Sequence, residues 1–107
     1  MGEPTLASAL DSLGYAHQHL GDYAEATACY QQAVDLHRQV GGRWGAAETL
    51  GHLGDAHRAA GNPAQARTAW EEALTILDTL QHPDADQIRA KLKELSASRP
   101  DAAIRPA

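Results

Sequence analysis

Histidine is the residue type of this sequence best suited to chemistry, because imidazole binds metal ions and exchanges protons near neutral pH. The 107 residues include six histidines. His17 and His19 point to different sides of a helix, and His52 and His57 are five residues apart. Two ligands on one helical face need a spacing of four, so we predict no metal site and no cofactor. His17 and His57 are instead expected to be packed, hydrogen-bonded core residues, and charging them in acid would then destabilise the fold.

The other reactive side chains form no catalytic motif. The sequence has no Gly-rich phosphate loop after a strand and no nucleophile motif, and its carboxylates suit helix caps or solvated faces. We therefore predict that the protein is not an enzyme. Cys29 is the single cysteine, which excludes an intramolecular disulfide and fits a small packed residue in a reducing compartment.

Charge and hydropathy narrow the range of partners. The formal net charge is −5, the isoelectric point is about 5.6, and the nine basic residues are scattered. Phosphate backbones require clustered Lys and Arg, so we predict no direct binding to nucleic acid, which also disfavours a DNA-binding helix-turn-helix. No apolar run is long enough to span a membrane, and residues 1–10 lack a signal-peptide pattern, so we expect a cytoplasmic protein without a membrane partner.

The elements that would position any site are encoded twice. Residues 7–40 align with residues 47–80 at an offset of forty, which pairs Tyr30 with Trp70. Within each copy the apolar residues step by three or four, the spacing of one helical face. In the first helix of the first copy, the face predicted to point inward contains Leu6, Leu10, Leu13, His17 and Leu20.

Each copy is predicted to be an antiparallel pair of helices. Gly21 and Gly61 would end the two first helices. The second helices would then begin with capping boxes, formed by Asp22 with Glu25 and by Asn62 with Gln65 beside Pro63. Small residues opposite large ones would let the helices approach closely. The residues predicted to carry this packing are Leu13, Gly14, Ala26, Tyr30, Ala33, Leu53, Gly54, Ala66, Trp70 and Ala73.

These residues resemble the tetratricopeptide repeat family, whose pattern has Leu-Gly in the first helix and Ala, an aromatic and a later Ala in the second. The resemblance covers about residues 7–80 and implies an all-α stack of two antiparallel helix pairs. His17 and His57 replace the usual aromatic, the usual proline after the second helix is absent, and the period of forty exceeds the common 34 residues.

The segment between the two copies carries a narrower resemblance. It is similar to forty-residue repeats at the C-terminus of actinobacterial transcriptional regulators and nucleotide-binding signalling ATPases, which often have Gly-Asp-Arg-x-Gly-Glu-Ala here. Gly41, Arg43, Gly45 and Ala46 keep part of that motif, whereas Gly42 replaces the Asp. The resemblance implies a module of a bacterial regulatory or signalling protein.

The domain boundaries follow from the period. Repeat one is predicted at about residues 5–40, repeat two at about 44–80, and a capping helix at about 84–95 that begins with Asp84 and Gln87. Ile88, Leu92 and Leu95 would cover the second repeat, while Arg89, Lys91 and Lys93 face other directions. Residues 96–107 are predicted to be a disordered tail.

Function is expected to come from surfaces. In tetratricopeptide stacks, one face of each first helix lines a concave groove that holds a partner's peptide or helix. Carried over by position, the groove residues would be Ser8, Asp11, Tyr15, Gln18, Glu48, Asp55 and Arg58. This set implies a protein or peptide partner of basic or polar character. Asp11 and Tyr15 stand where some members use basic and amide residues to clamp an acidic peptide, so that activity is not expected.

The number of repeats also bears on assembly. About three repeats are normally needed for stability, and the first helix has no preceding cap. Two interpretations follow. Either the chain is a segment of a longer protein, or it self-associates as a stand-alone adaptor, forming a homodimer through its exposed N-terminal repeat.

Overall fold

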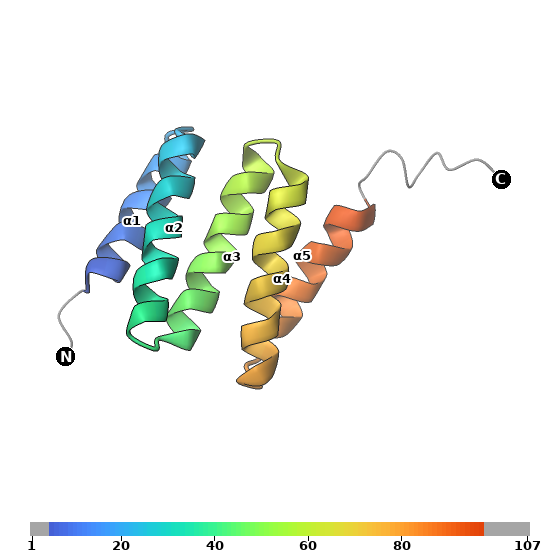
Figure 1. Ribbon diagram of the computed structural model, residues 1–107. Helices are drawn as coiled ribbons and strands as arrows, with labels where there is room; N and C mark the ends of the chain where they lie inside the picture. Colours follow the sequence, from blue (N-terminus) through green and yellow to red (C-terminus); the bar gives the residue numbers. More distant parts are fainter. Residues whose placement is uncertain (1–4, 98–107) are drawn as a thin grey trace.

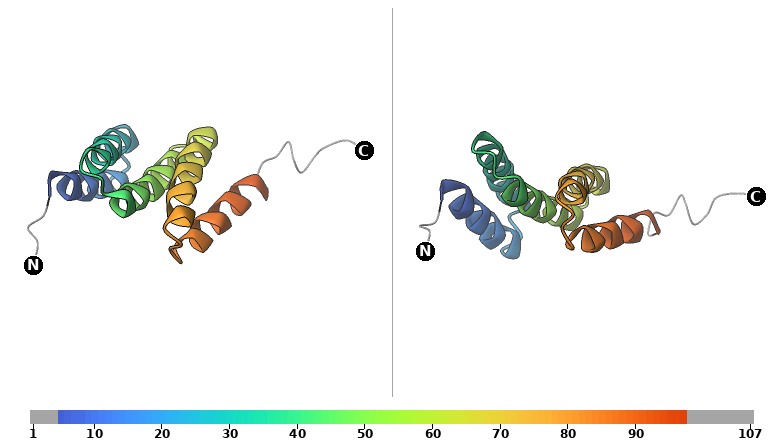
Figure 2. Two further views of the ribbon diagram at one scale, coloured as in Figure 1. Left: turned by 60° about the horizontal axis from the view of Figure 1, so that its bottom comes forward. Right: turned by 90° about the horizontal axis from the view of Figure 1, so that it is seen from below.

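Five helices in sequence form a two-layered stack. The computed structural model describes residues 5–97, in which the elements are α1 (Leu6–His19), α2 (Tyr23–Gln39), α3 (Arg43–Ala59), α4 (Pro63–Thr79) and α5 (Ala85–Ala97). Successive helices run antiparallel along the stack (Figure 1). The views in Figure 2 place α1, α3 and α5 in one layer and α2 and α4 in the other. The residues described contain no strand, and the fold is the predicted all-α stack of helix pairs.

Every connection between helices uses the same turn, and the turns recur every twenty residues. Gly21, Gly41, Gly61 and Gln81 follow the C-caps of α1 to α4, each with positive φ. The next residue donates its N–H to a carbonyl five residues back, as Asp22 does to His17 (2.9 Å). This is the Schellman arrangement, which satisfies the last carbonyls of a helix and reverses the chain. Only Gln81 has a side chain at this left-handed position.

The capping boxes predicted for α2 and α4 do not form. Asp22 and Asn62 are the N-caps, but neither side chain bonds to the first turn. The reason is the tight turn. The N–H of Asp22 is already bound to His17, and its ψ of 69° differs from the extended 165° of Thr5, whose Oγ1 does cap α1 by accepting from the N–H of Ser8 (3.0 Å). At α5 the N–H of Asp84 donates to His82 Nδ1 (3.1 Å), which excludes the third capping box.

Two large aromatic side chains form the centres of the helix pairs. Tyr30 and Trp70 are fully buried, and each lies against the glycine of the preceding first helix. A Cβ on Gly14 would be 2.8 Å from the Tyr30 ring. The hydroxyl of Tyr30 donates to Gln18 Oε1 (2.9 Å), and the indole N–H of Trp70 donates to the carbonyl of Gly51 (3.1 Å). The close approach of each pair therefore depends on the glycine.

The apolar face predicted for the first helix is only partly turned to the core: Leu10 and His17 are half-buried, but the prediction is wrong for its other three residues, Leu6, Leu13 and Leu20. Leu6 is 66% exposed, Leu13 48% and Leu20 76%, although Leu13 had been assigned to the packing set. α1 packs on α2 through Ala7 and Gly14 instead. The remaining packing residues named from the sequence are all buried, namely Gly14, Ala26, Tyr30, Ala33, Leu53, Gly54, Ala66, Trp70 and Ala73.

The two inward histidines also differ from expectation. His17 and His57 are half-buried, but the Nδ1 atom of each is buried without a hydrogen bond. Burial lowers the pKa of His57 below its ordinary value. At His57 the cause is the loss of hydration that the charged ring would suffer when it is buried.

α5 closes the far end of the stack. Ile88 and Leu95 join Trp70 and Leu77 in one core cluster, with Leu92 packed against it. The helix runs two residues beyond its predicted end, to Ala97. The disordered tail predicted for residues 96–107 therefore begins too early, and residues 98–107 lie outside the part of the chain that the structure describes.

Candidate functional site: the groove of the first helices

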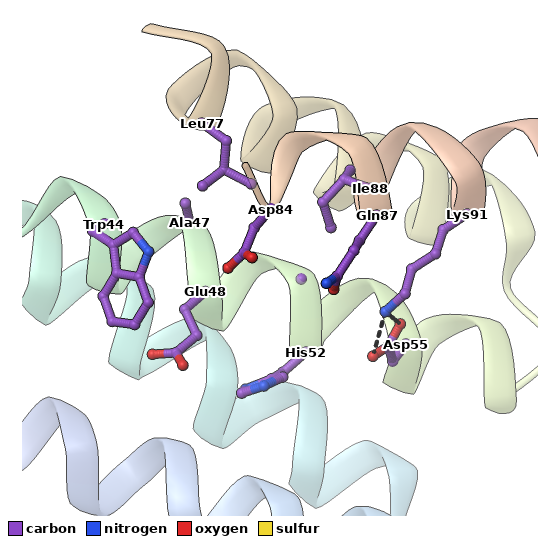
Figure 3. Close-up of a pocket in the computed structure, with 11 residues that line it drawn as sticks. Trp44, Ala47, Glu48, His52, Asp55, Leu77, Asp84, Gln87, Ile88 and Lys91 are labelled. Atoms are coloured by element: carbon purple, nitrogen blue, oxygen red, sulfur yellow. Dashed lines mark hydrogen bonds and ion pairs between the residues drawn. The ribbon is translucent and has the colours of Figure 1, made fainter. Parts of the chain in front are cut away.

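Two adjoining hollows lie along the layer of first helices. One, of about 310 Å³, lies between α1 and α3 and is lined by Ser8, Asp11, Ser12, His37, Trp44, Glu48 and His52. The other, of about 230 Å³, lies between α3 and α5 (Figure 3). Trp44, Glu48 and His52 line both, so the hollows form one continuous surface, which we call the groove.

The first hollow has a charged pair that links the two repeats. Asp11 accepts a hydrogen bond from the hydroxyl of Thr49 (2.6 Å) and lies 2.9 Å from Nδ1 of His52. Burial alone would raise the pKa of Asp11, but the bonds from His52 and Thr49 outweigh it and lower that pKa below its usual value. The bond to Asp11 raises the pKa of His52, against the opposing effect of burial. The pair therefore holds α1 against α3 most strongly when both groups are charged.

A second ion pair links α3 to α5. Lys91 Nζ lies 2.8 and 3.0 Å from the two carboxylate oxygens of Asp55 (Figure 3), and 5.8 Å from the centroid of the buried Trp70 ring. The sequence predicts that Lys91 faces away from the stack, but its side chain contacts α3. The charge of Asp55 is thus balanced within the molecule.

Within residues 5–97, neither Glu48 nor Asp84 has a cationic group at hydrogen-bonding distance. Glu48 makes no hydrogen bond or ion pair with residues 5–97, although its charge helps to raise the pKa of His52. Asp84 lies 3.6 Å from His82 Nδ1, beyond hydrogen-bonding distance, with a half-exposed side chain. In Figure 3, Asp84 extends from the turn before α5 toward α3, where Glu48 and Trp44 lie on the other side of the hollow. This end of the groove is therefore acidic.

The floor below these carboxylates is apolar. Ala47, Leu77 and Ile88 line the same hollow and are 1%, 3% and 7% exposed. Trp44 forms a wall and is 44% exposed, with its ring 5.9 Å from that of His82. An apolar floor, an aromatic wall and an acidic rim suit a side chain with a long aliphatic stem and a cationic head.

Four of the seven predicted groove residues line the hollows: Ser8, Asp11, Glu48 and Asp55. The other three lie outside them. Tyr15 is exposed with its ring 4.2 Å from that of His19, Gln18 is held by Tyr30, and Arg58 lies 3.6 Å from Glu94.

Several lining residues were not among the predictions. Trp44 has no predicted role, and His52 is considered above only as a metal ligand. Asp84 and Gln87 are predicted as a helix cap, and Lys91 is predicted to face away from the stack. Except for His52, their signal is the same offset of forty. Positions 44, 47, 48 and 51 of α3 line the hollow together with positions 84, 87, 88 and 91, in or just before α5. Extending the repeat alignment past Leu80 would have found this hollow.

Neither a metal centre nor a membrane segment is evident in the part of the chain described. Among residues 5–97, no three His, Cys, Asp or Glu side chains gather in a way that could hold a metal ion. None of the five helices has the length and apolar character needed to cross a membrane.

A known protein family matches both repeats of this chain. The family model described as tetratricopeptide repeat matches residues 5–79. This span contains α1 to α4, and it ends where the second helix pair ends.

Proposed function

The chain belongs to the tetratricopeptide repeat family, and we propose that its groove holds a basic segment of a partner protein or of its own parent chain. Repeats of this family generally mediate protein–protein interaction. The observation that supports a basic partner is the pair of carboxylates on Glu48 and Asp84, which no cation within residues 5–97 neutralises at hydrogen-bonding distance. An arginine or lysine could lay its stem on the apolar floor and bring its charge between them, beside Trp44.

The groove fits binding better than catalysis. Asp11 and His52 are the pair most similar to an acid–base couple, but they hold α1 to α3 and bond with Thr49. We propose that the module acts by binding alone. Turnover of a generic ester or phosphoester that disappears in Asp11→Asn would contradict this.

Two tryptophans make the binding proposal directly testable. The chain has Trp44 in the groove and Trp70 in the core, so the two indole N–H signals in an NMR spectrum report on different places. The probe is a helical alanine-rich peptide with one arginine, and the control peptide has glutamine in its place. We expect the arginine peptide to shift the Trp44 signal, to leave that of Trp70 in place, and to bind more weakly in salt.

Matched variants assign the effect to the acidic rim. Glu48→Gln and Asp84→Asn should each raise the dissociation constant of the arginine peptide about tenfold, because each removes roughly one charge-assisted contact. Glu71→Gln removes the same charge from an exposed site on α4 and should have no effect. Equal binding of the glutamine peptide, or an equal loss in Glu71→Gln, would refute a cation-binding groove.

We further propose that the module belongs to a regulatory or signalling protein of the bacterial cytoplasm. The support is the similarity of the turn around Gly41, Arg43, Gly45 and Ala46 to the motif of such regulators. Gly45 also has a packing role here, since a Cβ at that position would be 2.6 Å from His37 Nδ1. An antibody against this chain, used on a denaturing gel of the native host, tests the context. A band near the 11.4 kDa of the chain would contradict a multidomain regulator, and a much larger band would support it.

A further inference from the structure

The outer face of α1 has a regular apolar stripe that nothing within residues 5–97 covers. Leu6, Ala9, Leu13, Ala16 and Leu20 follow one another at steps of three and four, and all five are exposed. The three leucines are seven residues apart and are 66%, 48% and 76% exposed. We call these five residues the α1 seam. A 3,4 spacing that repeats every seven residues is the pattern by which two helices pack along their length.

The second repeat shows what this face does when it has a neighbour. At the offset of forty, the first four seam residues correspond to Ala46, Thr49, Leu53 and Ala56 of α3. These are 0–5% exposed, and Leu53 and Ala56 share a core cluster with Tyr30 of α2. The same positions that pack a helix in repeat two are therefore open in repeat one. The occupant that fits the α1 seam is a helix.

The chemistry of the α1 seam favours a helix of its own kind. α1 has no Lys, Arg or Glu, and its single carboxylate, Asp11, is bound in the groove to Thr49 and His52. Two copies of α1 can thus approach without repulsion between like charges. Alternating leucine and alanine also make the α1 seam complementary to itself. In an antiparallel pair, Leu6 of one copy lies opposite Ala16 of the other, and Leu13 lies opposite Ala9.

We propose that the α1 seam binds the α1 seam of a second copy of this chain, in an antiparallel two-fold contact with leucine opposite alanine. In this contact α1 would pack on α1 of the second copy through the same positions by which α3 packs on α2. The two copies of α1 would be related by a two-fold axis. It uses a different side of α1 from the groove, so each dimer presents two grooves. A single helix pair of this size forms a weak dimer.

Sedimentation equilibrium of the 107-residue chain tests the proposal. Over about 10 μM to 1 mM, the mass should rise from that of the monomer, 11.4 kDa, toward twice that value. Leu13→Glu and Ala16→Glu should each raise the dimer dissociation constant at least about tenfold, because each places an unpaired charge in the contact. Both positions are exposed, so the helical circular dichroism of the monomer should not change. Gln32→Glu adds the same charge to an exposed site on α2 and should leave the dimer intact.

A compensating variant tests the direction of the helices. In the antiparallel pair, the double variant A9K/L13E places a lysine of each copy opposite a glutamate of the other and should regain the dimer lost in Leu13→Glu. A parallel pair would place like residues together and would not regain it. A mass that stays at 11.4 kDa over the whole range would overturn the proposal and leave a helix of another protein or of a longer parent chain as the occupant. Dimers unaffected by both glutamates, or lost equally in Gln32→Glu, would also overturn it.

The outcome is independent of the proposed function. Glu48→Gln and Asp84→Asn should leave the monomer–dimer equilibrium unchanged, since both lie in the groove. Leu13→Glu should leave arginine-peptide binding unchanged. Failure of one proposal can therefore be told apart from failure of the other.

Discussion

Gly54→Ala is expected to destabilise the fold by about 3 kcal/mol, although alanine is the better helix former. The new Cβ would lie 2.7 Å from Trp70 Cε2 and closer still to two other ring atoms. Trp70 is fully buried, so the indole cannot move away without displacing α4. Overpacking of this kind costs about 1–3 kcal/mol. Moving the ring also breaks the bond from its N–H to the carbonyl of Gly51, which adds about 1–3 kcal/mol. The gain in helix propensity, about 1 kcal/mol, offsets only part of this.

Gly51 provides a matched control in the same helix. A Cβ there would meet only Ile88 Cδ1, at an ordinary contact distance of 3.6 Å. Gly51→Ala should therefore be neutral or more stable by up to about 1 kcal/mol. The assay is urea unfolding monitored by far-ultraviolet circular dichroism. The dependence of the unfolding free energy on urea concentration shows whether a substitution changes the denatured state.

A double-mutant cycle with Trp70→Leu shows whether the ring is the cause. Trp70→Leu alone opens a cavity, but it also makes room beside residue 54. The cost of Gly54→Ala should then fall by at least about 1 kcal/mol in the Trp70→Leu background. A Gly54→Ala variant as stable as the native chain, or two changes whose effects on stability simply add, would show that Trp70 does not limit the space at residue 54.

Three further predictions concern the turns and the titratable groups. Gln81→Gly should stabilise the fold by about 1 kcal/mol, measured as a higher urea midpoint, because residue 81 has a φ of 55° and its counterparts are glycines. Because the pKa of His52 is raised in the folded protein, His52 stabilises the fold fully below its unfolded-state pKa of about 6.5. This stabilisation is lost as pH rises through the folded-state pKa. Because the pKa of Asp11 is lowered in the folded protein, Asp11 stabilises the fold above its unfolded-state pKa of about 3.8. This stabilisation is lost as pH falls through the folded-state pKa. Asp11→Asn should thus cost most between these limits, and a constant cost from pH 3 to 8 would count against the ion pair. His57 has the opposite effect on stability from His52, because its pKa is lowered. Folding stability should therefore fall as pH drops below about 6.5. In His57→Leu, the urea midpoint should no longer show this fall.

The repeat pattern predicted the fold well because the same packing residues occur twice. Tyr30 with Gly14, and Trp70 with Gly54, are pairs of large and small residues at equivalent places, and both pairs are in contact. The pattern failed for α1, where Leu13 has the same sequence context as Leu53 but no helix beside it. Periodicity shows that a face is apolar, but whether it is buried depends on the next element in space.

The caps and the groove show a different limit. Asp22 has the residue type of a good N-cap, but the tight turn before it uses its N–H and sets its ψ, which the local pattern does not reveal. Ser8, Asp11, Glu48 and Asp55, which were named from their position within the repeat, line the hollows. The sequence did not single out Trp44, because it lies in the first turn of α3, at the junction of the two copies and outside the aligned residues 47–80.

The central claim is that the groove binds a basic segment beside Trp44. Its most direct test is photo-crosslinking in the native host from a benzophenone-bearing phenylalanine that replaces Trp44, with the linked residue mapped by mass spectrometry. The account predicts one linked segment with an arginine or lysine next to the attachment point, and loss of that product in the E48Q/D84N background. A product that survives this double variant, or that forms equally from the exposed Ala24 position on α2, would contradict the account.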